Sequence, residues 1–187
     1  MLDAYIYDGL RSPFGRSGGA LSGIRPDDLL AEVIRPLMNR SQLDGSAIDD
    51  VIIGCGNQAG EDSRCVARHA ALRAGLPIEV PGTVIQRNCG SGLGAMISAA
   101  HALTCGEGDV VISGGVESMS RSPFVIAKHA RPFARQLDWY DSAVGARFPN
   151  PQLEKEFGSD SMPQTADNLA QEHGISREES DAFALRS

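Results

Sequence analysis

The sequence has few aromatic residues, an excess of acidic over basic residues and no long apolar run. Aromatic residues make up 5% of the 187 residues, and the formal net charge is −7 at pH 7. This charge argues against a protein that binds the phosphate backbone of nucleic acids. No apolar stretch reaches the roughly 18 residues that favour a membrane-spanning helix, and the N-terminus has no basic and apolar secretory signal. We therefore expect a cytoplasmic protein with neither a nucleic acid nor a membrane as partner.

Cysteine is also scarce, and no metal-binding spacing is present. The cysteines are Cys55, Cys65, Cys89 and Cys105, and none of them form a CxxC motif. A chain of this size can form a core without disulfides, so we expect all of them to be reduced. The histidines are His69, His101, His129 and His173, and no two of them lie four residues apart around an acid. We therefore predict no metal site.

Strand-like and helix-like segments alternate along the first two thirds of the chain. Short apolar runs predict strands over 4–7, 51–53, 83–86 and 109–113. Helices are predicted from Pro26, over 64–74 with Gly75 as the stop, and from the Cys89 segment to about Gly106. This βαβαβαβ alternation predicts an α/β fold, with a mainly parallel sheet and helices on both faces.

The pattern becomes irregular after this part. We predict an incomplete α/β domain over 1–118 and part of a loop domain over 119–187, with a short helix near 165–172 and another from Ser176. Ser176 and Glu179 have the spacing of a capping box. The sequence stops within this last helix, so we expect a truncated chain or a gene fragment.

The stretch Arg87–Ala95 has the strongest chemical signal. Cys89 follows an apolar strand and precedes a helix without charged residues up to Gly106. The N-terminus of a helix favours a thiolate, and glycines allow a close approach of other groups. Cys89 is therefore a candidate nucleophile, with packing as a small apolar side chain as the alternative. The other cysteines lack this context, and we predict that they pack.

Three further patterns leave alternatives open. Gly90–Ala95 fits the G-x-G-x-x-A dinucleotide fingerprint, with Glu117 in the place of a ribose-binding acid, although two strand–helix units precede it. The uncharged helix behind Cys89 predicts burial on all sides, between the sheet and a second domain or subunit. Several basic side chains follow in the irregular part of the chain. They form either a rim for an anionic ligand or a set of solvated charges: Lys128, Arg131, Arg135 and Arg147.

Four motifs in order resemble the thiolase family. They are Arg11–Gly15, Asn88–Gly92, Gly114–Ser120 and Met162–Asn168. Two more stretches, Gly56–Asp62 and Asp160–Pro163, resemble the branch that cleaves 3-oxoadipyl-CoA in aromatic catabolism.

The resemblance implies a fold, a reaction and site residues. The fold would be the N-terminal α/β layer of a thiolase with part of its loop domain. Cys89 would accept an acyl group from acyl-CoA as a thioester, with its own N–H in the oxyanion hole, and a second CoA would release the group. Met162 would lie near the acyl and pantetheine end of the substrate. Acyl-CoA and CoA would be substrates, no cofactor is expected, and the full-length protein would be a homodimer or homotetramer.

The sequence also departs from the family pattern. Many short-chain members have a histidine where Ser161 stands, which argues against acetoacetyl-CoA as substrate. A general 3-ketoacyl-CoA thiolase and an acetoacetyl-CoA thiolase are the alternatives. The family's catalytic Gly-His-Pro motif, Asn-Glu-Ala-Phe motif and second cysteine belong to a C-terminal half that this sequence lacks. We therefore expect the chain to be inactive alone, and a non-catalytic dimerising fragment is the alternative class.

Overall fold

The computed structural model describes residues 2–129, 131–133 and 135–187. The chain forms two compact units, Met1–Val144 and Gly145–Ser187. The domain boundary expected after residue 118 stays a prediction.

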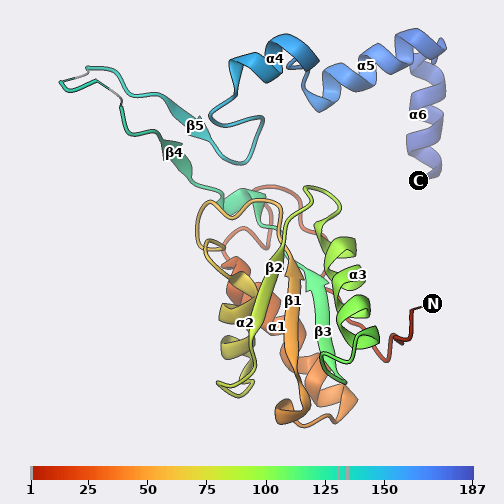
Figure 1. Cartoon of the computed structure of the whole chain (residues 1–187). Coiled ribbons are helices and arrows are strands. Elements are labelled where there is room, and N and C mark those ends of the chain that lie inside the picture. Colours follow the sequence, from red (N-terminus) through yellow and green to blue (C-terminus); the bar gives the residue numbers. More distant parts are fainter. Residues whose placement is uncertain (1, 130, 134) are drawn as a thin grey trace. The chain divides into compact units, whose positions relative to one another are not determined.

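The first unit is built on a three-stranded parallel sheet in the order β2-β1-β3 (Figure 1). The strands are β1 (Asp50–Gly54), β2 (Gly82–Ile85) and β3 (Val111–Gly115). Helices α1 (Pro26–Ser41) and α2 (Val66–Ala74) cover one face, and α3 (Ser91–Thr104) covers the other. The short 3-10 helix η1 (Gly45–Ala47) precedes β1. The predicted α/β fold with helices on both faces is confirmed.

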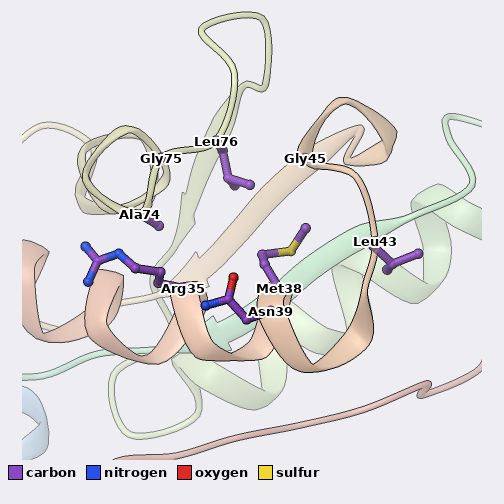
Figure 2. Close-up of a pocket in the computed structure, with 8 residues that line it drawn as sticks. All are labelled: Arg35, Met38, Asn39, Leu43, Gly45, Ala74, Gly75 and Leu76. Carbon is purple, nitrogen blue, oxygen red and sulfur yellow. The ribbon is translucent and has the colours of Figure 1, made fainter.

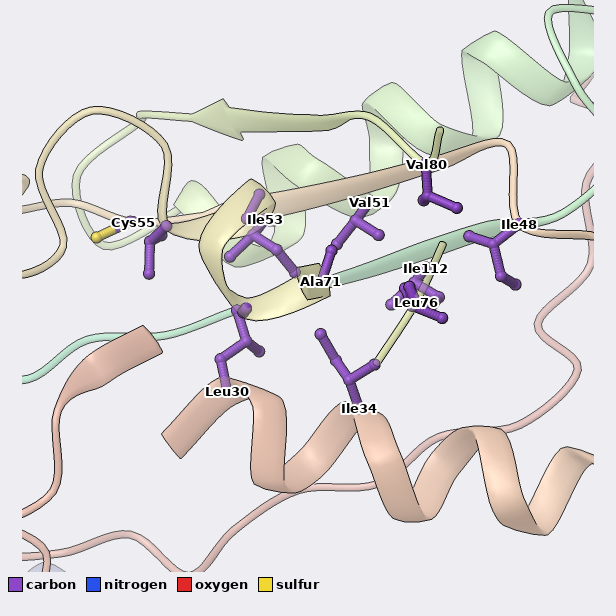
Figure 3. Packing of buried hydrophobic residues seen from close by; sticks show 13 residues of the cluster. Leu30, Ile34, Ile48, Val51, Ile53, Cys55, Ala71, Leu76, Val80 and Ile112 are labelled. Atoms are coloured by element: carbon purple, nitrogen blue, oxygen red, sulfur yellow. The ribbon is translucent and has the colours of Figure 1, made fainter. Parts of the chain in front are cut away.

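The main core lies between the sheet and the pair α1 and α2 (Figure 3). Val51 and Ile53 of β1 point to this side and are fully buried with Ile34 of α1 and Val66 of α2. Ile52 points to the other side, where it packs against Ala95 and Ala99 of α3. Because β1 is buried on both faces, its sequence is a continuous apolar run rather than an alternating one.

The predicted strand over 4–7 is wrong. Tyr5, Ile6 and Tyr7 belong to no strand and are 79% to 88% exposed. A strand needs a neighbour to accept and donate its backbone hydrogen bonds, and no strand of the described residues pairs with this segment. Hydrogen bonds instead anchor it on both sides: the Asp3 N–H donates to Thr104 Oγ1 at 3.0 Å, and the Arg40 guanidinium donates to the Asp8 carboxylate and the Gly9 carbonyl. The Tyr-Ile-Tyr run has the right propensity but lacks a strand to pair with.

The first unit continues with η2 (Met119–Arg121) and an antiparallel hairpin, β4 (Phe124–Ile126) and β5 (Trp139–Asp141). The rings of Phe124 and Trp139 pack edge to face across it, with centroids 5.1 Å apart. The sequence patterns did not predict this hairpin.

The second unit contains three helices, α4 (Pro151–Phe157), α5 (Met162–His173) and α6 (Arg177–Arg186). The capping box of Ser176 and Glu179 is present at the start of α6, as predicted. The predicted helix near 165–172 is confirmed and begins earlier, at Met162. No residue of these helices is buried. Across the described residues, no helix combines the length and the apolar character needed to cross a membrane.

Candidate functional site

Cys89 lies in a tight turn between β2 and α3. The Gly90 N–H donates to the Arg87 carbonyl at 3.0 Å, and the Ser91 N–H donates to the Asn88 carbonyl at 3.1 Å. Gly90 is the N-cap of α3, so Cys89 immediately precedes the helix, and its side chain is exposed. The structure thus confirms the predicted placement of Cys89 at a helix start, and it adds that the thiol is accessible.

The turn is held from inside by Ser91, which is only 3% exposed. The Ser91 hydroxyl accepts the Arg87 N–H at 2.9 Å and donates to the Asn88 carbonyl at 2.6 Å. Asn88 has a φ of +49°, in the left-handed region that asparagine tolerates better than most residues. These bonds fix the backbone on both sides of Cys89.

The first turn of α3 lies directly on the ends of two strands. A Cβ at Gly54, the last residue of β1, would lie 2.2 Å from the Ser91 carbonyl carbon. A Cβ at Gly115, the last residue of β3, would lie 3.3 Å from the Gly92 Cα. The sequence pattern predicted close approach at the glycines around Cys89, but the tightest contact occurs at Gly54. Only the packing of α3 on β1 could identify it.

Glu117, which follows β3, binds the backbone of the turn that follows β1. Its Oε2 accepts the Gly56 N–H at 2.8 Å, and its Oε1 accepts the Asn57 N–H at 3.2 Å. Both carboxylate oxygens are therefore engaged by backbone donors. The dinucleotide interpretation stays an alternative, and its proposed ribose-binding acid also has a structural role in this fold.

The other cysteines differ in their surroundings. Cys55 is buried, and burial, followed by the negative charges of Glu117 and Asp62, raises the pKa of its thiol to about 12. Cys65 is half-buried, whereas Cys105 is exposed at the end of α3. The prediction that these cysteines pack in the core is confirmed for Cys55. It is wrong for Cys105, because no layer covers the end of α3 among the described residues. All four cysteines are free thiols, as predicted.

One group of side chains in the described part of the chain has the proximity of metal ligands. The Cys55 sulfur and carboxylate oxygens of Asp62 and Glu117 lie within 4.8 Å of one another. The Cys55 thiol already donates to the Asn57 carbonyl at 3.6 Å, and the Glu117 carboxylate already accepts two backbone N–H groups. This group is therefore better explained as part of the hydrogen-bonded structure around Gly56.

A shallow pocket of about 210 Å³ lies between α1 and α2 (Figure 2). Its lining comes from the ends of the two helices and from the segments that follow them: Arg35, Met38, Asn39, Leu43, Gly45, Ala74, Gly75 and Leu76. Gly45 precedes β1 and Leu76 precedes β2, so the pocket lies toward the beginnings of the strands. Cys89 follows the end of β2, and the pocket is not part of its surroundings.

Met162 is the first residue of α5 in the second unit, and it is 80% exposed. Its proposed contact with substrate stays a prediction. Both interpretations of Lys128, Arg131, Arg135 and Arg147, a rim for an anionic ligand or solvated charge, stay open.

The model of the thiolase N-terminal domain matches residues 4–187. The chain belongs to the thiolase family. It is 57% identical to the beta-ketoadipyl-CoA thiolase of Escherichia coli, over 100% of this chain and 47% of that protein. The chain thus spans about half the length of the curated thiolases it matches.

Solved thiolase structures have the same fold. The acetyl-CoA acetyltransferase of Bacillus anthracis superposes with a TM-score of 0.82 at 36% identity, over 95% of this chain and 44% of that one. Human mitochondrial 3-ketoacyl-CoA thiolase, solved in complex with CoA, gives a TM-score of 0.80 at 33% identity, over 94% and 44%. The thiolase fold and membership of this acyltransferase family are therefore established for the chain.

Proposed function

We propose that Cys89 is the acyl-accepting nucleophile of an acyl-CoA thiolase. The observation that carries this proposal is the exposed thiol immediately before α3, in a turn fixed by Asn88 and Ser91, in a chain of the thiolase family. The partial positive charge at the N-terminus of a helix favours negative charge, both on a thiolate and on a carbonyl oxygen under attack.

The reaction has two steps. The Cys89 thiolate attacks the 3-oxo carbonyl of a 3-oxoacyl-CoA, the bond between C2 and C3 breaks, and the departing acetyl-CoA carbanion takes a proton. The shortened acyl group is left on Cys89 as a thioester. The thiol of a second CoA then loses its proton and attacks this thioester, which forms the new acyl-CoA and returns the Cys89 thiolate. The two proton transfers need an acid and a base. We assign these to the family's histidine and second cysteine motifs, so the chain alone is proposed to be inactive.

The proposed substrate is 3-oxoadipyl-CoA, which would give succinyl-CoA and acetyl-CoA. Two observations support it. Identity reaches 57% to the Escherichia coli beta-ketoadipyl-CoA thiolase but 36% to the Bacillus anthracis acetyl-CoA acetyltransferase. Ser161 also replaces the histidine of many short-chain members. Acetoacetyl-CoA and general 3-ketoacyl-CoA substrates are the alternatives.

A chimera tests this proposal. The chain replaces the matching half of the Escherichia coli beta-ketoadipyl-CoA thiolase, and the CoA-dependent loss of 3-oxoacyl-CoA absorbance is measured with 3-oxoadipyl-CoA and with acetoacetyl-CoA. We expect the kcat/KM for 3-oxoadipyl-CoA to be at least about tenfold higher than that for acetoacetyl-CoA. The reason is that a site adapted to a polar substrate group discriminates against substrates that lack this group. The 187-residue chain alone should show no turnover. A folded chimera without CoA-dependent cleavage of either substrate would refute the proposed thiolase function. A preference for acetoacetyl-CoA would refute 3-oxoadipyl-CoA as the proposed substrate.

A second candidate function, self-association, is favoured by the outer face of α3. Leu93, Met96 and Ile97 are 64%, 40% and 46% exposed, although this uncharged helix was predicted to be buried on all sides. An apolar surface of this kind is suited to a protein contact. We expect the chain to have the mass of a dimer in light scattering and Leu93→Glu to have that of a monomer. A monomeric parent chain that binds no apolar dye would contradict this.

A further inference from the structure

The ends of the three strands of the sheet are joined to one another next to Cys89. Gly56 follows β1, Gln86 and Asn88 follow β2, and Glu117 follows β3. Besides backbone bonds, these segments are joined by two side chains, Glu117 and Gln86, which the proposed chemistry does not use.

Glu117 makes the first connection, from the end of β3 to the end of β1. Its carboxylate accepts the N–H groups of Gly56 and Asn57, at 2.8 and 3.2 Å. Gly56 is suited to this position because a Cβ there would lie 2.9 Å from Glu117 Oε2 and 3.5 Å from the Asn88 carbonyl oxygen. Hydrogen bonds from backbone N–H groups to a carboxylate are stronger than those to a neutral acceptor, so this turn is held firmly.

Gln86 makes the second connection, from this turn to the residue before Cys89. Its Nε2 donates to the Gly56 carbonyl at 3.2 Å and to Asn88 Oδ1 at 3.0 Å. The amide group of Gln86 thus bridges the turn held by Glu117 and the side chain of Asn88.

Asn88 needs such support because its backbone has a left-handed φ of +49°. A residue other than glycine keeps this conformation when surrounding contacts enforce it. The Asn88 carbonyl is held by Ser91, and its side chain is held by Gln86. The conformation of Asn88 in turn sets the direction in which the chain presents Cys89.

We propose that Gln86 and Glu117 are positioning residues for Cys89, which act through Gly56 and Asn88 to hold the thiol at the start of α3. This inference rests on the proposed role of Cys89 as the nucleophile. Neither side chain needs to touch the substrate. Their contribution is to keep residues 88 and 89 in one backbone conformation.

The test uses the 187-residue chain and needs no catalytic turnover. Iodoacetamide is added in limiting amount, and alkylation of Cys89 and Cys105 in the same molecules is quantified by peptide mass spectrometry. Both thiols are exposed and lie at opposite ends of α3, so Cys105 is an internal reference. Buried Cys55 reports loss of the fold, because it reacts only when the core opens.

We expect Gln86→Ala to lower the ratio of Cys89 to Cys105 alkylation about two- to fivefold, because Cys89 leaves the field of the helix start. Gln86→Leu, which keeps a side chain of similar size but removes the donor amide without adding charge, should do the same, and so should Glu117→Gln. Adding Asn88→Gly to Gln86→Ala should restore the ratio, because glycine takes a positive φ without support. The matched control Glu79→Gln alters an exposed acid outside this network and should leave the ratio unchanged.

An unchanged ratio in both Gln86 variants, with Cys55 still unreactive, would overturn the proposal. A reduced ratio that Asn88→Gly restores would support it. If Cys55 becomes reactive in Glu117→Gln, this variant has lost its fold, and the proposal is then judged on the two Gln86 variants alone. The chimera assay is a separate measurement, so failure of thiolysis with a reduced alkylation ratio would reject the thiolase proposal and leave the positioning role standing.

Discussion

Gly54→Ala is expected to destabilise the first unit by about 2–4 kcal/mol and to displace the start of α3. The added Cβ would lie 2.2 Å from the Ser91 carbonyl carbon and 2.3 Å from the Gly92 nitrogen. Both are backbone atoms of a helix, so no side-chain rotation can relieve the contact. Either the helix moves away from β1, or β1 shifts within the sheet. Urea unfolding, followed by circular dichroism, measures the decrease in the free energy of unfolding.

The matched control is Gly114→Ala in β3. The nearest atom to a Cβ at that position is Ile53 Cδ1, at 3.9 Å, which is an ordinary contact. We expect this variant to stay within about 1 kcal/mol of the parent chain, as strand alanines without a clash do. Equal stabilities of the two variants would show that α3 does not lie on Gly54 as closely as described.

Cys89→Ala in the chimera is expected to lower kcat for thiolysis by a factor of about 10³ or more, because no other side chain can carry the acyl group between the two steps. The KM for the 3-oxoacyl-CoA should change little, since substrate binding does not depend on the thiol. Mass spectrometry after mixing with acyl-CoA alone should detect the acyl group on the Cys89 peptide of the parent chimera and on no peptide of the variant.

Cys105→Ala is the control for this experiment. Cys105 is also an exposed free thiol, but it lies at the opposite end of α3 from Cys89. We expect this variant to keep thiolysis within about twofold of the parent chimera, as surface substitutions commonly do. An acyl group found on Cys105, or activity that survives Cys89→Ala, would show that the nucleophile is misassigned.

Local patterns predicted several features correctly because their physical causes lie within a few residues. Gly75 ends α2 in a left-handed conformation, with its N–H bonded back into the helix. Ser176 and Glu179 cap α6 through reciprocal bonds three residues apart. The strand, turn and uncharged helix around Cys89 likewise placed this thiol at a helix start. In each case the interacting groups are close neighbours in the sequence.

The failures share the opposite property. The segment 4–7 has strand-forming residues but no neighbouring strand, and Cys105 is exposed because no described residue covers the end of α3. The role of Glu117 depends on Gly56, which lies 61 residues earlier in the chain.

The sequence by itself determined the α/β alternation, the thiolase motifs and the position of Cys89 before α3, since periodicity, capping and motif spacing are local. Only the tertiary structure decided that Gly54 must lack a side chain and that Glu117 and Gln86 connect the strand ends beside Cys89. Those roles arise from contacts between residues distant in the chain, and such contacts exist only after the strands have been ordered β2-β1-β3 and α3 has packed on them.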